Sequence, residues 1–78
     1  MKETIMAILA ETVGADAKEL EDDMALFEDG LLDSFGVVSL LVGIEDKLGI
    51  RIEPTEMTRD DIATPAKLVG YVMGKMES

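Results

Sequence analysis

The sequence contains no cysteine, no histidine and no tryptophan, and only 4% of its 78 residues are aromatic. Without cysteine there is no disulfide, no zinc-thiolate site and no thiol catalysis. Without cysteine or histidine, a hydrolase or transferase would need a carboxylate pair in a cleft, and a chain this short offers little cleft. The core must be built from Leu, Ile, Val, Met and Ala, which suits helix packing. We therefore expect a small helical protein that is not an enzyme in its own right.

Basic residues are also scarce, with 7 Lys and Arg against 17 Asp and Glu and a net charge of −10. Binding to nucleic acid or to an anionic membrane is disfavoured, because both require a cationic surface. No apolar run approaches the roughly 20 residues of a membrane-spanning helix. The apolar stretch 5–10 is too short for a signal peptide and is followed by Glu11. We expect a cytoplasmic monomer that is not membrane-inserted and whose partners are proteins with basic surfaces.

Apolar residues at helical spacing predict three main helices, over residues 3–13, 34–48 and 65–76. Gly14 and Gly49 are stop signals for the first two, Asp33 is an N-cap for the second, and Thr64 followed by proline starts the third. A fourth, short helical turn is predicted over residues 58–62, after an extended connector over 50–53. The buried positions expected in the last helix are Leu68, Val69, Val72 and Met76.

A long acidic connection separates the first two predicted helices. Residues 15–33 contain eight acids and one base, with Leu20, Met24, Leu26 and Phe27 spaced among them. Because an unstructured loop of this length is unusual in a compact domain, we expect these apolar residues to pin it to the helices, with a short turn of helix. The expected fold is all-α: a single domain over residues 1–78, built as a small four-helix bundle of three main helices and one short helix.

The most informative residue is Ser34, in the sequence Gly30-Leu31-Leu32-Asp33-Ser34-Phe35. It lies where the acidic loop meets the second helix. A hydroxyl group at such a junction is accessible to a partner enzyme, and the N-terminal end of a helix favours a negative group attached there. Ser34 is therefore better interpreted as an attachment point than as a catalyst.

In an acidic, helical chain of this length, the Gly-Leu-Leu-Asp-Ser-Phe motif resembles that of the acyl carrier protein family. The resemblance implies a 4′-phosphopantetheine arm, taken from coenzyme A, on Ser34, with an acyl group held on the arm as a thioester. It implies partners that include a phosphopantetheinyl transferase, a loading ligase, and a downstream acyltransferase or synthase with a basic docking surface. Asp33 would help to bind magnesium during arm transfer, in the complex with the transferase. The pathways implied are fatty-acid, polyketide or specialised lipid biosynthesis.

Within that family the sequence is most similar to the D-alanyl carrier branch. The matching features are Phe35 after the serine, Gly36 two residues after it, and the late Thr64-Pro65 pair. That branch often has an aromatic residue at the position of Ile62 and an acidic residue at the position of Gly43, so the cargo stays open between an acyl group and D-alanine.

The second predicted helix also presents a candidate docking face, hereafter the docking face, made of Phe35, Val38, Val42, Glu45 and Asp46. Ordinary core packing for the apolar members, or plain solvation for the acids, is the alternative interpretation. We also hypothesise that Gly36 and Gly43 leave space inside the bundle for part of an acyl cargo.

Two other classes of protein share some of these features. An EF-hand would need acidic ligands at set positions around Gly30, but the register puts Ala25 at the first ligand and Gly36 at the last, so no protein-bound metal is expected. A helical interaction module, in which Ser34 only starts a helix, stays open and is distinguished by whether Ser34 is modified.

Overall fold

The computed structural model describes residues 2–77. Three α-helices, α1 (Lys2–Val13), α2 (Ser34–Leu48) and α3 (Pro65–Glu77), are joined by segments with three short 3₁₀ turns: η1 (Ala17–Glu19), η2 (Pro54–Glu56) and η3 (Arg59–Ile62). No strand occurs among these residues. The all-α prediction is confirmed, with η3 as the short fourth element.

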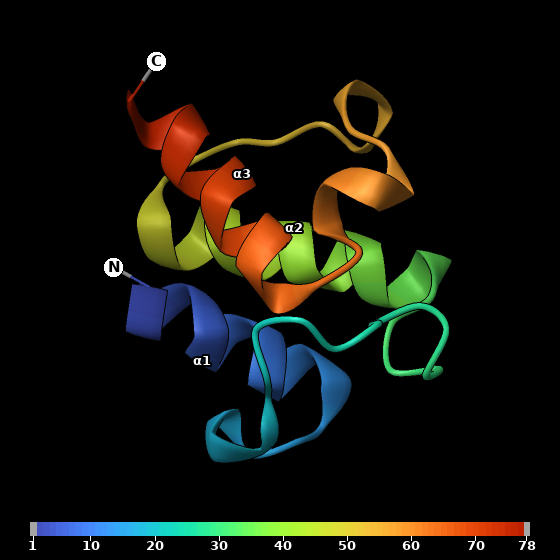
Figure 1. Cartoon of the computed structure of the whole chain (residues 1–78). Coiled ribbons are helices and arrows are strands. Elements are labelled where there is room, and N and C mark those ends of the chain that lie inside the picture. The colour runs from blue at the N-terminus through green and yellow to red at the C-terminus, as the bar shows by residue number, and fades with distance from the viewer. Residues whose placement is uncertain (1, 78) are drawn as a thin grey trace.

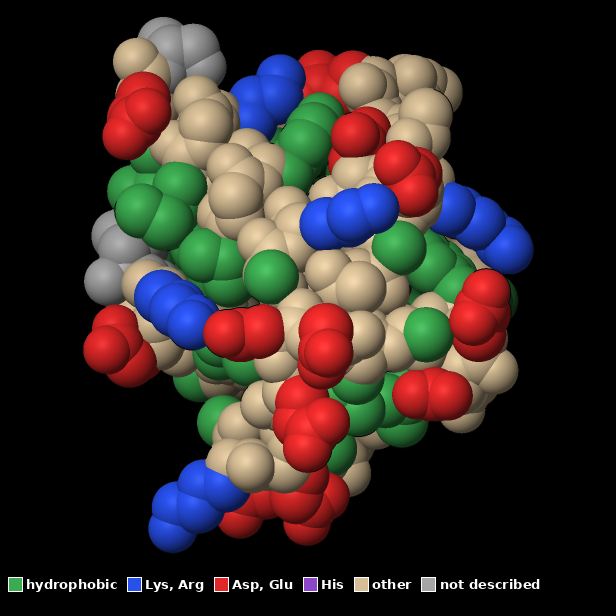
Figure 2. Space-filling view, in the orientation of Figure 1, with side chains coloured by type: hydrophobic (Ala, Val, Ile, Leu, Met, Phe, Trp, Pro, Cys, Tyr) green, Lys and Arg blue, Asp and Glu red, His purple; other side chains and the backbone are tan. Residues whose placement is uncertain are grey.

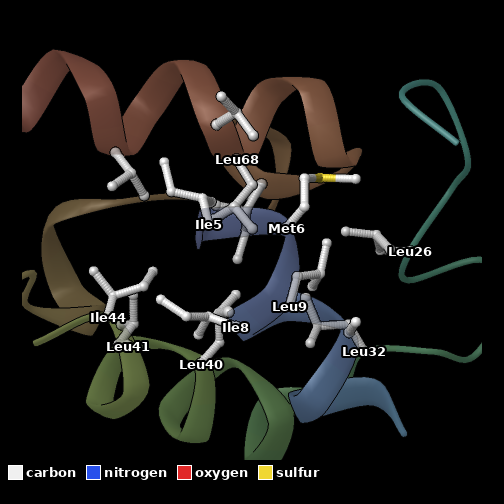
Figure 3. Close-up of a cluster of buried hydrophobic side chains, with 14 of the residues drawn as sticks. Ile5, Met6, Ile8, Leu9, Leu26, Leu32, Leu40, Leu41, Ile44 and Leu68 are labelled. Atoms are coloured by element: carbon white, nitrogen blue, oxygen red, sulfur yellow. The ribbon is translucent and has the colours of Figure 1, made fainter. Parts of the chain in front are cut away.

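The core lies where the three helices meet, with α1 packed against both α2 and α3 (Figures 1 and 3). Ile5 and Leu9 of α1 are fully buried between Leu40 and Ile44 of α2 and Leu68 of α3. Apolar side chains three or four positions apart form one stripe on each helix, and burying these stripes stabilises the bundle.

The prediction that Met76 is buried is wrong. Its side chain is 40% exposed, whereas Leu68, Val69 and Val72 are buried as expected. Met76 has the right spacing for the apolar stripe, but the C-terminal end of α3 slants away from α1 and α2 (Figure 1). Helical spacing determines which face of a helix a residue lies on. Burial also requires that another element packs against that face at the same position along the helix.

Local capping explains where the helices begin and end. Gly14 and Gly49 have left-handed φ angles of 73° and 70°, which glycine adopts without a steric penalty, and they follow the last residues of α1 and α2. Thr64 Oγ1 accepts a hydrogen bond from the Lys67 N–H at 3.2 Å and so caps α3, which starts with Pro65. These features confirm the predicted starts and stops.

The acidic loop over residues 14–33 is held to the bundle by its apolar residues, as predicted. Leu20, Leu26 and Leu32 are buried in the common core. The Leu26 N–H donates to the Ala63 carbonyl at 2.9 Å, and the Leu31 and Leu32 N–H groups donate to the Leu26 carbonyl. The loop therefore reaches Ser34 along a defined path.

The connector between α2 and α3, residues 49–64, returns along α2 towards the beginning of that helix (Figure 1). Ile52 is buried and anchors the extended part. The following turn η2 was not predicted; it begins at Pro54, whose fixed φ suits the first position of such a turn. An ion pair between Glu56 and Lys75 joins η2 to α3.

Gly36 and Gly43 allow close packing and do not leave space for a cargo. A Cβ added at Gly43 would lie 3.0 Å from the Ile8 side chain of α1, and one added at Gly36 would lie 3.0 Å from the Leu32 side chain. Both distances are shorter than an ordinary contact between carbon atoms. The hypothesis of a cargo space inside the bundle at these two glycines is therefore wrong, and the groove that Gly43 lines is a surface groove between α1 and α2.

None of the helices in residues 2–77 has the length and apolar content needed to cross a membrane. Acidic side chains cover much of the lower half of the surface shown in Figure 2, in the region where Figure 1 places the loop between α1 and α2.

Candidate functional site

Ser34 is the first residue of α2 and is exposed. Asp33 immediately before it caps the helix, because its Oδ1 accepts a hydrogen bond from the Gly36 N–H at 2.7 Å. Leu32, only 3% exposed, anchors the preceding turn in the core. Ser34 is thus accessible from solvent on a backbone that is fixed from both sides.

A cavity of about 280 Å³, hereafter the Ser34 cavity, opens beside this serine. Its walls come from the start of α2, from the acidic loop and from the returning connector. The lining residues are Phe27, Ser34, Val37, Val38, Pro54, Met57, Thr58, Arg59 and Ile62. Most of them are apolar, so a flexible chain attached to Ser34 would find a largely hydrophobic surface next to its attachment point.

Arg59 is the basic member of this lining. Its guanidinium group lies over the ring of Phe27, 5.0 Å from the ring centroid, in a cation–π arrangement. The turn that presents Arg59 is fixed by the Thr58 N–H, which donates to Asp61 Oδ2 at 2.9 Å. The cavity therefore has one positive group on its rim in an otherwise strongly acidic protein.

The residues of the docking face all lie on the outer surface of α2. Phe35 is 85% exposed, Val38 50% and Val42 59%, and Glu45 and Asp46 are exposed as well. Residues spaced three and four apart share one helix face. The apolar members are therefore not core residues. The five share one surface of α2, which runs from Phe35 beside Ser34 to Asp46 about three turns further along the helix.

Asp46 also borders a groove of about 440 Å³ on the other side of α2, where this helix packs against α1 at Gly43. The docking face thus lies between this groove and the Ser34 cavity. In the part of the chain that the structure describes, no group of three or more acidic side chains is arranged to hold a metal ion.

Glu56 of η2 forms a small cluster with Tyr71 and Lys75 of α3, in which two pKa values are perturbed. Burial raises the pKa of the Tyr71 hydroxyl, and the neighbouring Glu56 carboxylate raises it further. A hydrogen bond to Glu56 raises the pKa of the Lys75 ammonium group. None of these three residues lines the Ser34 cavity. The cluster therefore holds the connector to α3 and does not contribute to the site.

The structure places Ser34 and Asp33 at the start of α2 and the docking-face residues on its exposed surface, as expected from the sequence, and their functional roles stay predictions. The connector side of the cavity was not predicted. Arg59 and Met57 come within reach of α2 only because the connector turns back towards the start of that helix. No local sequence pattern predicts the course of the connector. The one available signal was Arg59 itself, a base in a chain where acids outnumber bases by more than two to one.

The comparisons with known proteins agree with this geometry. Residues 3–72 match the protein family described as "Phosphopantetheine attachment site". The chain is 46% identical over 68 residues to the D-alanyl carrier protein of Bacillus velezensis, covering 87% of each chain. It is 41% identical over 71 residues to D-alanyl carrier protein 1 of Lactiplantibacillus plantarum, covering 91% of this chain and 88% of the relative.

The fold is also similar to a solution structure of a holo acyl carrier protein from Nitrosomonas europaea. The TM-score is 0.80 at 21% sequence identity, over 99% of this chain and 96% of that one. Fold, motif and relatives over nearly the whole chain thus converge: the chain belongs to the phosphopantetheine-binding carrier proteins, which bear a 4′-phosphopantetheine prosthetic group.

Proposed function

We propose that Ser34 carries the 4′-phosphopantetheine arm and that the protein is a D-alanyl carrier. The observation that supports the attachment point is the exposed Ser34 at the first position of α2, beside a cavity open to solvent. The residues fit the group: the helix N-terminus suits the phosphodiester, and the apolar cavity wall suits the pantetheine chain. When bound, the arm supplies a thiol that holds the cargo as a thioester.

The cargo is inferred from the relatives and from the packing. The relatives named above are D-alanyl carriers, similar to this chain over most of its length. A short, polar aminoacyl group needs no buried channel, whereas a long acyl chain gains about 0.8 kcal/mol per buried CH₂. The tight contacts at Gly36 and Gly43 leave no such channel inside the bundle, and the surface groove beside Gly43 is lined mostly by polar residues. An acyl carrier of fatty-acid, polyketide or lipid synthesis is the second candidate, favoured by the apolar lining of the Ser34 cavity.

The protein's own part in arm transfer is to present a nucleophile. The Ser34 hydroxyl oxygen attacks the phosphorus of coenzyme A that bears pantetheine, the new P–O bond forms, and the bond to the adenosine bisphosphate breaks. A base on the transferase takes the hydroxyl proton. Asp33 holds the helix start in place and offers a second carboxylate oxygen to a magnesium ion in that complex. No catalytic base on this chain is needed, which fits a carrier that is not itself an enzyme.

The docking face would meet the partner enzymes, namely the transferase, an ATP-dependent ligase that loads D-alanine, and a downstream acyltransferase. Its exposed apolar residues can be buried in a partner, and Glu45 and Asp46 match a basic surface. Coenzyme A, which donates the arm, and ATP are intracellular, which supports a cytoplasmic location for this protein. We also propose that the chain acts as a monomer.

The test of the attachment is intact mass after incubation with coenzyme A and a promiscuous phosphopantetheinyl transferase. The wild type should gain one phosphopantetheine and Ser34→Ala none. Ser39→Ala is the matched control, because Ser39 is another exposed serine on α2 and its loss should change nothing. An unmodified, folded wild type would make the protein a helical interaction module instead.

The test of the cargo uses the modified protein with ATP and a D-alanine ligase of the carrier-loading class. One alanyl group should be added and removed again by hydroxylamine, which cleaves thioesters. Loading by a fatty acyl–carrier synthetase, with no loading by the D-alanine ligase, would favour the second candidate.

A further inference from the structure

We infer that Arg59 binds the phosphodiester of the arm and so holds the arm's first atoms at the rim of the Ser34 cavity. The inference rests on the proposed attachment to Ser34. It starts from placement, because Ser34 on α2 and Arg59 on η3 line the same cavity although 25 positions separate them.

Arg59 is available to bind an anion. It forms no ion pair with any carboxylate in residues 2–77, although acids outnumber bases 17 to 7 in the sequence. The two acids that follow it in the chain have other partners. Asp60 pairs with Lys67 at 3.2 Å, and Asp61 accepts from the Thr58 N–H. The guanidinium group rests on the Phe27 ring instead, which leaves its N–H groups free to donate.

The chemistry of the two groups matches. A phosphodiester carries one negative charge on two oxygens, and the planar guanidinium fork can donate to both. Of the other bases without an ion pair, neither Lys18 nor Lys47 lines this cavity. Attachment of the arm adds a negative charge to a chain at −10, which by itself would increase charge repulsion. A cation already placed at the attachment site offsets that repulsion locally.

The experiment compares unmodified and phosphopantetheine-bearing protein for the wild type, Arg59→Gln and Arg59→Lys. Arg51→Gln is the matched control, because Arg51 is exposed, pairs with Glu53 and does not line the cavity. The readout is the melting temperature of the modified form minus that of the unmodified form, at low salt. Taking this difference within each variant cancels any effect of losing the Phe27 contact.

We expect the difference to be about 2–6 °C more favourable in the wild type and in Arg51→Gln than in Arg59→Gln. Arg59→Lys should fall between them, since it keeps the charge and loses the fork. The advantage should shrink at high salt. In addition, the side-chain Nε–Hε NMR signal of Arg59 should shift when the arm is attached.

Failure of this inference can be told apart from failure of the proposed function. If mass spectrometry shows no arm on the wild type, the attachment itself is wrong. If all variants are fully modified but Arg59→Gln shows the wild-type temperature difference, and the Arg59 signal does not move, Arg59 does not bind the phosphodiester. Its positive charge would then be free to face a partner protein.

Discussion

Gly43 of α2 lies against Ile8 of α1 so closely that a Cβ added to the glycine would lie 3.0 Å from Ile8 Cγ2. Ile8 is buried and β-branched, so its methyl group has little freedom to move away. The glycine therefore sets how near the two helices approach. Because glycine in a helix interior costs about 1 kcal/mol relative to alanine, this close approach offsets a loss of intrinsic helix stability.

Substitution of this glycine separates the two effects. In Gly43→Ala the gain in helix propensity is opposed by the contact with Ile8, so the protein should be no more stable than the wild type. In Gly70→Ala a Cβ meets nothing within 4 Å, and we expect stabilisation by up to about 1 kcal/mol. Urea unfolding of both variants measures the free energies. Equal stabilisation by both would show that the Gly43–Ile8 contact does not constrain the helices.

Asp33 caps α2, and a pair of variants tests whether it also has the proposed role in arm transfer. Asp33→Ala removes the cap on the Gly36 N–H and should lower stability by about 1 kcal/mol. Asp33→Asn keeps an oxygen that can cap the helix but loses the negative charge. If the charge helps magnesium during arm transfer, Asp33→Asn should be nearly as stable as the wild type and yet be modified much more slowly. Modification at the wild-type rate would restrict Asp33 to capping.

The sequence predicted those parts of the structure that short-range physics determines. The helix starts and stops at Gly14, Asp33, Gly49 and Thr64 agree with the structure because caps act within a few residues. The shared exposed surface of the docking-face residues was also predictable from helical spacing, whereas their role in docking stays a prediction.

The features that the sequence did not predict depend on how separate segments meet. The Ser34 cavity exists because Met57 and Arg59 return to α2, and Met76 is exposed at the end of α3 that slants away from α1 and α2. The role of Gly43 depends on the same kind of contact, since only its distance from Ile8 shows whether the glycine leaves a space or allows close packing.

The cluster of Tyr71, Lys75 and Glu56 predicts a loss of stability in alkali. Burial together with Glu56 raises the pKa of Tyr71, and the hydrogen bond to Glu56 raises the pKa of Lys75. The folded chain therefore holds these two protons to higher pH than the unfolded chain does. Stability due to them is complete below about pH 10 and is lost as the pH rises through the raised pKa values.

Thermal melts between pH 8 and 12 measure this effect. Glu56→Gln should be less stable than the wild type at pH 8, because it loses the ion pair, and should lose less of its stability as the pH rises. The exposed pair of Arg51 and Glu53 gives the control Glu53→Gln, whose alkaline decline should match that of the wild type. If Glu56→Gln declines as steeply as the wild type, the cluster does not carry the pH dependence.

The excess of acids predicts that salt stabilises the fold. With a net charge of −10, the folded chain brings like charges together, and the ion pairs described here are mostly at exposed positions, where such pairs contribute little. Sodium chloride should therefore raise the melting temperature, most steeply below about 0.2 M where screening changes fastest. Magnesium should act at lower concentration. A melting temperature independent of salt would show that charge repulsion does not limit stability.

Phe35 is the strongest candidate for an apolar anchor on the docking face, because its side chain is 85% exposed and adjoins Ser34. Phe35→Ala should leave the free energy of unfolding within about 0.5 kcal/mol of the wild type, since little packing is lost. It should raise the KM of the phosphopantetheinyl transferase or the D-alanine ligase for this carrier about five- to thirty-fold, as loss of a central aromatic anchor does at other interfaces. Met73→Ala removes an exposed apolar side chain from α3 and serves as the control, with both KM values unchanged. If Phe35→Ala and Met73→Ala are processed alike, the partners dock elsewhere, and the exposure of Phe35 needs another explanation.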